Sequence, residues 1–301
     1  MATGVDERPV RIVDAPLAPP AENLGLLSVF KRRYLLKLLV QREISGRYSN
    51  SILGVFWSYI NPLTQFLVYW IFMGEIMGMS DAKGMENYPV HLFAGLVIVH
   101  FFTETFGAGT RSLMGNKGLL KKMAMPKEMF PVASMLVSLY HLVPATLILV
   151  VVCVFSGWTP SWDTIPAFLL ALGIVMALGT ALALVFSLAN VFFRDFGSAV
   201  NILTNYIRFG VPMMYPFTMI EGALGDKSWI YLLNPISDAV LLFQQAFWVG
   251  VTKNPEQTAA TNMPDHLWMW GLGAFGVSLV LLVIAQLIFS KHENKIPERL
   301  T

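Results

Sequence analysis

The sequence predicts an all-α integral membrane protein with six transmembrane helices, an N-terminal amphipathic interface helix and an outer re-entrant helix pair. Of the 301 residues, 55% are hydrophobic and only 13% are charged, and the mean hydropathy is +0.59. Apolar runs of about 20 residues, the length that crosses a bilayer, recur along the chain. Lys and Arg gather between alternate runs. This composition excludes a water-soluble globular enzyme and an intrinsically disordered protein, because both carry more charge.

The N-terminal region is predicted to lie on the cytoplasmic side. Residues 1–23 combine prolines with mixed charges and have no apolar core, so we expect a mobile cytoplasmic tail rather than a signal peptide. Residues 24–54 mix leucines with a density of Lys and Arg that disfavours a span. A helix in the headgroup plane would bury the leucines and expose the cations to anionic lipid. The alternative is a soluble amphipathic helix that docks on a partner protein.

Residues 55–290 are predicted to form one transmembrane domain. The expected spans cover residues 55–77, 90–109, 130–155, 165–193, 199–219 and 267–289. A further apolar run, residues 229–249, contains Pro235 and Asp238, which are costly within hydrocarbon. We therefore expect residues 229–249 to enter and leave the membrane from outside as a broken helix pair.

The distribution of cations determines the predicted topology. With six spans, all but three of the 21 Lys and Arg residues fall on the same side of the membrane; the three are Lys83, Lys227 and Lys253. Because Lys and Arg are retained in the cytoplasm, both termini are expected there, including a cytoplasmic tail of residues 291–301. Seven crossings would place this basic tail outside.

The sequence contains no motif for capturing chemical energy. It lacks the G-x-x-x-x-G-K-[ST] phosphate loop and the G-x-G-x-x-G dinucleotide motif. Energy must then come from another chain or from an ion gradient. His100 and Glu104 lie four residues apart on one helical face and are the candidates for gradient coupling, with a structural hydrogen-bonded pair as the alternative. The single cysteine permits no intrachain disulfide and no cysteine-based metal site, and we expect no metal.

The loop between the second and third predicted spans is amphipathic. Residues 111–131 carry Leu119 and Leu120 among Lys117, Lys121 and Lys122. A free loop needs no such leucines, whereas a short helix that inserts into a groove of another protein does. We predict a docking helix here, and a helix lying on lipid is the alternative.

Residues 42–62, with the sequence REISGRYSNSILGVFWSYINP, carry a family signature. They resemble the N-terminal signature of ABC type-2 exporter permeases that move polysaccharides, O antigens and teichoic acids. The matching positions are Arg47, Tyr48, Ser51, Leu53, Gly54, Trp57 and Pro62. Shorter agreements occur at Asn116, Leu119, Leu120 and Lys122, at Phe193-Arg194-Asp195 and at Asn234-Pro235. The resemblance covers about residues 24–290.

The resemblance implies the partners. In this family a homodimeric permease in the bacterial inner (plasma) membrane is driven by two nucleotide-binding ATPase subunits. ATP and Mg²⁺ belong to these ATPases, and no cofactor is expected in this chain. The cargo is a polyprenyl-pyrophosphate-linked glycan, and membrane lipids are further partners; nucleic acid is not expected. The resemblance implies an ATPase contact at Asn116, Lys117, Leu119, Leu120, Lys121 and Lys122.

Several residues are predicted to form the entrance for the lipid pyrophosphate. Arg47 and Tyr48 fall at headgroup height, which suits a lipid phosphate, and ordinary interfacial anchoring is the alternative. Gly54 permits a sharp bend where the surface helix becomes a span. The complete group is Arg42, Arg47, Tyr48, Ser51, Gly54 and Arg208.

Two further pairs of residues are expected to be structural. Arg194 and Asp195 follow the fourth span, and we expect a self-paired charge couple at the inner membrane boundary. Asn234 and Pro235 are expected to set the re-entrant turn, because proline at this point ends one helix and favours the start of another.

The first span carries an aromatic stripe. Phe56, Tyr59, Phe66 and Trp70 lie at helical offsets 0, 3, 10 and 14 and therefore share one face. Such rings are candidates for lining a glycan channel, where they would offer a smooth stacking surface to sugars. The alternative is packing against another helix or against lipid.

These observations predict the transmembrane permease subunit of an ATP-driven exporter. Its cargo would be a polyprenyl-pyrophosphate-linked polysaccharide of the O-antigen, galactan or teichoic acid type, which moves from the cytoplasm to the outer side of the inner membrane. The chain itself is not expected to be an enzyme. An ABC exporter of a drug or small lipid is the nearer alternative, and a proton-coupled transporter is the more distant one.

Overall fold

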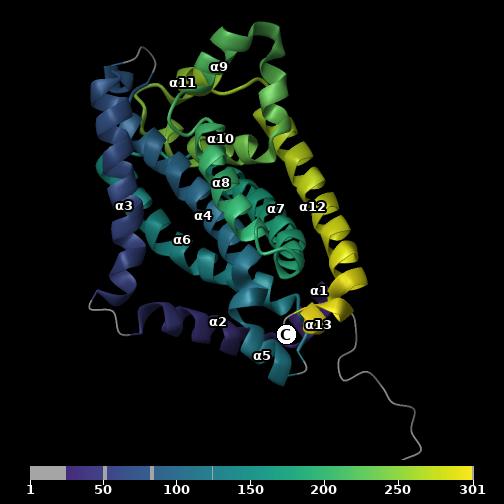
Figure 1. The fold of residues 1–301 in the computed structure, drawn as a ribbon. Coiled ribbons are helices and arrows are strands. Elements are labelled where there is room, and N and C mark those ends of the chain that lie inside the picture. The colour runs from purple at the N-terminus through teal and green to yellow at the C-terminus, as the bar shows by residue number, and fades with distance from the viewer. Residues whose placement is uncertain (1–24, 50–52, 82–84, 124, 300–301) are drawn as a thin grey trace, which may run out of the picture.

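The computed structural model describes residues 25–49, 53–81, 85–123 and 125–299. Within these ranges every regular element is a helix, so the all-α fold class is confirmed for them (Figure 1). The elements are α1 Leu26–Lys31, α2 Arg33–Tyr48, η1 Gly54–Phe56, α3 Trp57–Tyr69, η2 Trp70–Ile76, η3 Met79–Asp81, α4 Tyr88–Gly115, α5 Lys117–Lys122, α6 Met129–Phe155, α7 Thr164–Phe192, α8 Phe196–Phe209, α9 Phe217–Leu224, η4 Gly225–Leu233, α10 Pro235–Phe247, η5 Val249–Val251, α11 Pro255–Asn262, α12 Leu267–His292, η6 Glu293–Lys295 and α13 Ile296–Arg299.

Among the described residues, four helices are long and apolar enough to cross a membrane. They are Tyr88–Gly115, Met129–Phe155, Thr164–Phe192 and Leu267–Lys295. These helices coincide with the second, third, fourth and sixth predicted spans. They run between one end of the molecule that carries α9 and α11 and another that carries α1, α2, α5 and α13 (Figure 1). We call the latter the basal end.

The first predicted span is helical but divided. η1, α3 and η2 follow one another without a gap from Gly54 to Ile76. Gly54 begins this stretch with φ +49°, a backbone conformation that glycine adopts readily. Pro62 lies inside α3 and lacks the N–H that would continue the hydrogen-bond ladder. Because the stretch is split into 3₁₀, α and π pieces, no single piece has the length of a span.

The fifth predicted span, residues 199–219, is not one helix. α8 ends at Phe209, residues 210–216 are irregular, and α9 begins at Phe217. Pro212 and Pro216 account for this break, because proline donates no backbone hydrogen bond and disfavours helix in the residue before it. The irregular segment is buried, since Val211, Met213 and Met214 are at most 2% exposed.

The irregular segment is held by two side chains from other helices. The hydroxyl of Tyr88 in α4 donates to the Met214 carbonyl at 2.9 Å. The amide nitrogen of Gln244 in α10 donates to the Pro212 carbonyl at 2.9 Å. Non-helical backbone is tolerated at membrane depth only where protein or a water-filled cavity surrounds it. The two bonds satisfy two backbone carbonyls that have no helical partner.

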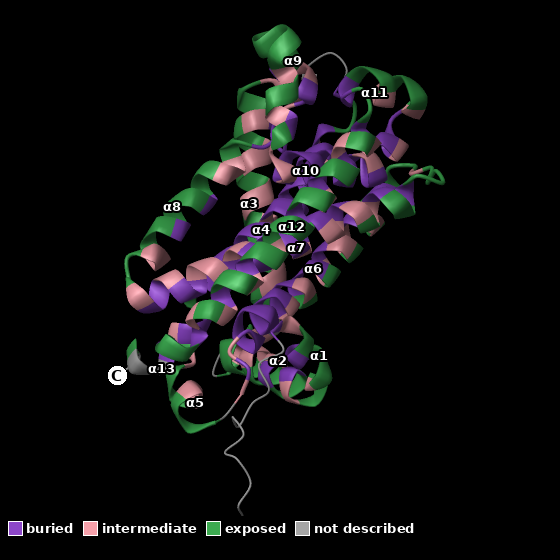
Figure 2. Cartoon of the chain, turned by 90° about the vertical axis from the view of Figure 1, so that its right-hand side faces the viewer, coloured by how far each residue is buried: buried purple, intermediate pink, exposed green. Residues whose placement is uncertain are grey.

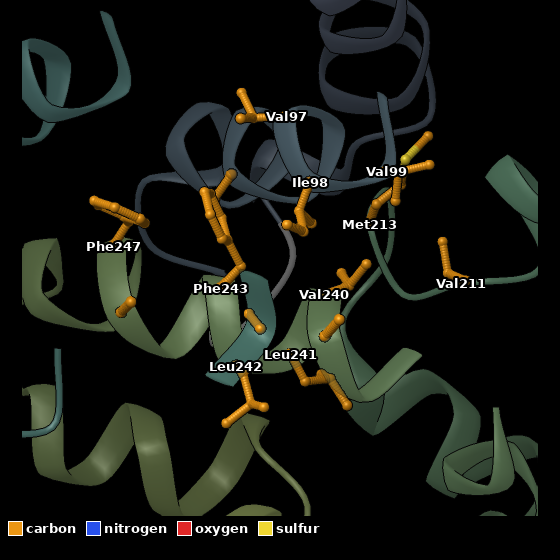
Figure 3. Packing of buried hydrophobic residues seen from close by; sticks show 14 of the residues in the cluster. Val97, Ile98, Val99, Val211, Met213, Val240, Leu241, Leu242, Phe243 and Phe247 are labelled. Atoms are coloured by element: carbon orange, nitrogen blue, oxygen red, sulfur yellow. The ribbon is translucent and has the colours of Figure 1, made fainter. Parts of the chain in front are cut away.

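α4 is the central helix of the bundle. It packs against α6, α7, α8 and α10, and 83% of its most apolar window is buried. Figure 2 shows buried surface concentrated on α4 and α10, whereas α8 and α12 expose much of their surface. In Figure 3, Ile98 and Val97 of α4 share one cluster with Met213 and with Val240 and Phe243 of α10.

A second hydrophobic cluster lies at the basal end. α2 crosses this end of the long helices (Figure 1) and buries Leu36 and Leu39 while most of its charged residues stay exposed, as expected of an amphipathic helix. The C-terminal segment joins the same cluster, because Ile296 is fully buried and the Lys127 ammonium donates to the Glu293 carbonyl at 2.7 Å. The C-terminal tail predicted to begin at residue 291 is therefore packed against the basal end through Glu293 and Ile296.

Close packing of α4 against α7 depends on Gly109. A Cβ at this position would lie 2.4 Å from the Cβ of Ala183 in α7, whereas a Cβ on Gly115 would meet nothing within 4 Å. We expect Gly109→Ala to lower the thermal unfolding midpoint of the purified protein in detergent by about 2–6 °C, because the two helices must separate. The matched Gly115→Ala control should leave the midpoint unchanged or raise it slightly. Equal midpoints for the two variants would contradict this packing.

Candidate functional site

The main cavity of the described chain lies among α2, α3, α4, α6 and α8 and has a volume of about 710 Å³. Its lining is rich in polar side chains, which is unusual for a molecule with this composition. Several lining residues, including Arg111 and Asn201, are exposed, so the cavity is open to the surroundings of the single chain. The lining contains Arg47, Tyr48, Trp57, Ser58, Asn61, Pro62, His100, Thr103, Glu104, Gly107, Arg111, His141, Asn201, Thr204, Asn205 and Arg208.

One wall of the cavity is a network of hydrogen bonds centred on Glu104. Arg47 Nη1, at the end of α2, lies 2.5 Å from Glu104 Oε1 in α4. His141 Nδ1, in α6, lies 2.8 Å from the same oxygen. Because a carboxylate only accepts hydrogen bonds, both nitrogens donate to it. The carboxylate is 14% exposed and therefore needs these partners to remain charged.

The network continues to α3 through Tyr48. The Tyr48 hydroxyl lies 2.8 Å from His141 Nε2 and also contacts the hydroxyl of Ser58. When His141 is neutral and Nδ1 carries its proton, Nε2 accepts from Tyr48. Four elements, α2, α3, α4 and α6, are thereby joined at one point. If the last turn of α2 moves, it must either break these hydrogen bonds or move α3, α4 and α6 with it.

The rest of the cavity lining is cationic. Arg111 Nη1 donates to the Asn201 side-chain oxygen at 2.9 Å, which links α4 to α8. Arg208 lies two helical turns beyond Asn201 on the same helix. Glu104 is the one carboxylate among the described lining residues, against three arginines. The described lining therefore has an excess of positive charge.

A much smaller space, which we call the constriction, borders the main cavity. A space of only about 10 Å³ shares His100 and Arg208 with the main cavity and is also lined by Gln65, Tyr69 and Met213. Met213 belongs to the irregular segment 210–216. A Cβ on Gly95 of α4 would lie 2.6 Å from the Met213 Cβ, so the segment rests directly on α4 at this point. Met213 is thus the point at which the irregular segment borders this narrow space.

The residues predicted to form the ATPase contact lie at the basal end next to α2. Asn116 accepts a hydrogen bond from Arg42 at 2.9 Å and donates one to Glu43 at 3.2 Å. Burial raises the pKa of Glu43, and the Asn116 hydrogen bond and the charges of Arg47 and Arg42 oppose this rise. Because of these bonds, α2 and the α4–α5 junction are one structural unit.

Leu119 and Leu120, the apolar residues of the predicted docking helix, pack against their own chain. Both are partly buried against the basal hydrophobic cluster of their own chain, and their contact with an ATPase stays a prediction. The exposed residues of this loop are Lys117, Lys121, Lys122 and Met123, and Met123 is 47% exposed. A partner that approaches the basal end would meet these lysines and this methionine.

The structure separates the four residues of the aromatic stripe. Phe66 and Trp70 are partly buried, with parallel rings 6.2 Å apart, and Phe66 packs edge-on against Phe93 of α4 at 5.1 Å. Phe56 is 67% exposed and lies 6.2 Å from Tyr59. None of the four lines the main cavity. Phe66 and Trp70 therefore pack as the alternative describes, whereas Phe56 is the one exposed residue of the four.

The remaining predicted residues have structural surroundings. Asn234 caps α10, because its side-chain oxygen accepts from the Ile236 backbone N–H at 3.1 Å, and Pro235 is the first residue of that helix. Arg194 and Asp195 are both exposed and do not form the ion pair that the sequence suggested. Ser51 lies outside the described residues.

Sequence reasoning missed the polar face of α8 and the role of His141. Asn201, Asn205 and Arg208 are spaced i, i+4 and i+7, which places them on one helical face. That spacing within an apolar run was a readable signal. His141 was visible only as an isolated polar residue, because its partners Glu104 and Tyr48 are 37 and 93 residues away.

Comparison with known proteins identifies relatives over most of the chain. Residues 34–248 match the family described as ABC-2 type transporter. The chain is 28% identical over 270 residues to the O-antigen export system permease protein RfbA of Myxococcus xanthus, which covers 90% of this chain and 96% of that protein. It is 26% identical over 265 residues to a protein of the same name from Klebsiella pneumoniae, with 88% and 94% coverage. The family match includes every described residue that lines the cavity.

The bond between Arg47 and Glu104 is testable by a double-mutant cycle. We expect Arg47→Ala and Glu104→Gln to be coupled by about 1 kcal/mol in the free energy of unfolding, since the pair is charge-assisted but Arg47 is partly exposed. Denaturant titration of the four proteins in detergent micelles measures this value. Arg42→Ala with Glu104→Gln is the matched control and should be additive. Additivity of the Arg47 and Glu104 variants would show that the contact contributes nothing.

Proposed function

Because this chain belongs to the ABC-2 type transporter family, we propose that it is the permease subunit of an ATP-driven exporter of a polyprenyl-pyrophosphate-linked polysaccharide. The glycan would move from the cytoplasm to the outer side of the bacterial inner membrane. The observation that carries the proposal is the large polar cavity of about 710 Å³ with its excess of arginine. A pyrophosphate with attached sugars needs such a lining, because charged and hydroxyl groups lose their hydration on entering the membrane.

The relatives favour an O-antigen type of glycan over the other classes. Proteins named O-antigen export system permease align with nearly the whole chain. Galactan and teichoic acid exporters share the predicted family signature but have no such support here. A drug or small-lipid exporter is less compatible with the cavity, because an apolar cargo gains nothing from three arginines and several amides.

A proton-coupled transporter is the more distant alternative. Its expected coupling residue, Glu104, is bound by Arg47 and His141 rather than paired with His100. A proton carrier at Glu104 would have to give up both of these hydrogen bonds during transport, so this residue is better suited to a structural role. This arrangement favours an ATPase as the source of energy.

The proposed topology has six spans. The continuous helical stretch from Gly54 to Ile76 and the α8 helix would complete the four long helices. α10 would be the deep part of an outer re-entrant segment, since nearly all of its residues are buried. The basal end, which carries α1 and α13 (Figure 1), would face the cytoplasm, and both termini would lie on that side. Two copies related by a two-fold axis would enclose the cavities, because each cavity is open in the single chain.

The ATPase is a separate subunit in this family and would bind ATP and Mg²⁺. It would grip the basal end at α2 and at the loop that contains α5. The exposed Lys117, Lys121 and Lys122 give this surface a positive charge, and Met123 gives it an apolar anchor. The bonds of Asn116 to Arg42 and Glu43 would make α2 and α5 move together.

The ATPase contact predicts a loss of complex formation. We expect the variant with Lys121→Glu, Lys122→Glu and Met123→Asp to retain about a tenth or less of the ATPase that co-purifies with the wild-type chain in mild detergent. The side chains are exposed, so membrane insertion and thermal stability should be unchanged. Lys227→Glu, at an exposed lysine far from α5 in sequence and at the opposite end, is the matched control. Undiminished co-purification would refute this surface as the contact.

Depletion of the protein in its native cell tests the proposed transport. We expect polyprenyl-linked glycan to accumulate in the cytoplasmic leaflet, because synthesis continues while export stops. Lipid extraction followed by mass spectrometry measures the accumulation, and glycan at the cell surface should fall in parallel. Normal surface glycan in the depleted cells would overturn the proposed function.

A further inference from the structure

The charges of the cavity are unevenly matched. Arg47 is paired with Glu104 at 2.5 Å. Arg111 has a neutral partner, the Asn201 amide, and Arg208 forms no ion pair with any described residue. Two guanidinium charges are therefore left without a carboxylate in the described part of the cavity. Arg111 is exposed and Arg208 is partly buried, so both guanidinium groups are accessible to an anion that enters the cavity.

The two unpaired arginines come from facing helices. Arg111 lies on α4 and Arg208 on α8, which pack against each other. A Cβ on Gly107 would lie 3.4 Å from Arg111 Nη2, so the Arg111 side chain folds back along α4 over this glycine. The guanidinium therefore lies at the level of Gly107, four residues before Arg111 on α4. This is about 6 Å along the helix axis from the Arg111 Cα, in the direction of His100 and Arg208.

Uncharged donors lie between the two arginines. Asn205 is spaced between Asn201 and Arg208 on the same face of α8, and all three line the cavity. An amide donates hydrogen bonds without adding charge. The cavity therefore presents two arginines, with Asn201 and Asn205 of α8 as neutral amides next to them.

We propose that Arg111 and Arg208 form the subsite for the pyrophosphate group of the cargo, with Asn205 as a neutral donor between them. This proposal rests on the proposed function and assigns the headgroup to specific residues. A pyrophosphate diester carries about two negative charges, one on each phosphate, which match the two unpaired guanidinium groups. Arginine binds phosphate oxygens through two parallel N–H donors, which favours one arginine for each phosphate.

The proposal changes the role that the sequence suggested for Arg47. Its charge is already matched by Glu104, so Arg47 holds α2 in place and is not the primary phosphate ligand. Arg208 also lines the constriction next to Met213. A pyrophosphate bound between Arg111 and Arg208 would therefore lie close to Met213 of the irregular segment.

The test is binding of geranylgeranyl pyrophosphate to the purified permease–ATPase complex in nanodiscs of phosphatidylcholine. Arg111→Gln and Arg208→Gln should each weaken binding by about 10-fold to 100-fold, since each removes a charge-assisted contact. Arg208→Lys should give an intermediate loss, because lysine keeps the charge but not the paired donors. Arg194→Gln, at an exposed arginine that does not line the cavity, is the matched control and should bind as the wild type does.

Competing ligands distinguish the source of the anion. Geranylgeranyl monophosphate and phosphatidylglycerol should compete weakly, and inorganic pyrophosphate should compete better than inorganic phosphate. Equal competition by phosphatidylglycerol would show a general lipid-phosphate site and overturn the proposal. An equal loss in Arg194→Gln would overturn it as well, because the effect would then be one of overall charge.

The outcomes also separate this proposal from the proposed function. Complex recovery by size-exclusion chromatography and an unchanged thermal midpoint establish that each variant is folded. If folded Arg111→Gln and Arg208→Gln complexes bind the pyrophosphate as the wild type does, while depletion still blocks glycan export, the subsite is wrong and the function stands. If binding depends on both arginines but export is normal without the protein, the two arginines bind pyrophosphate, whereas the proposed function and the assignment of this site to its cargo are wrong.

Discussion

The ion pair between Arg47 and Glu104 fixes the relation between the basal helices and the bundle. Glu104 is largely buried, and a buried carboxylate without a cation would be strongly unfavourable. Arg47 supplies that cation from the last turn of α2, and His141 of α6 donates a second hydrogen bond to the same carboxylate oxygen, Oε1. The position of α2 is therefore set by the charge inside the bundle. The same pairing leaves Arg111 and Arg208 as the free charges of the cavity, so mechanical coupling and ligand binding depend on one contact.

The irregular segment of residues 210–216 is held in place by contacts with other helices. An irregular backbone segment is normally excluded from hydrocarbon, yet residues 210–216 lie within an apolar run. Tyr88 and Gln244 bind two of its carbonyls, and Gly95 lets Met213 approach α4 closely. Met213 of this segment lines the constriction next to the cavity, and residues 210–216 are not helical. A rearrangement of residues 210–216 would thus require less loss of regular structure than the movement of a continuous span.

The fold class and four spans were predictable because length and hydropathy alone determine them. The break after Phe209 was readable from Pro212 and Pro216, but the apolar composition of the run outweighed these signals. The sequence indicated Arg47, Tyr48 and Glu104 separately and not as a network. Arg47 is 57 residues from Glu104, and Tyr48 is 93 residues from its partner His141, so no local pattern links them. The inward packing of Leu119 and Leu120 was likewise hidden, since an amphipathic helix looks the same whether it meets its own chain or a partner.

Reconstitution tests whether this chain is a conduit that depends on an external motor. The measurement is the appearance of a polyprenyl-linked glycan on the far side of vesicles that contain this chain, with and without its ATPase and ATP. We expect movement of the glycan only when chain, ATPase and ATP are all present, and no movement under a proton gradient alone. Transport by this chain without an ATPase would contradict the mechanism in which forces applied at α2 and α5 reach the cavity through Arg47.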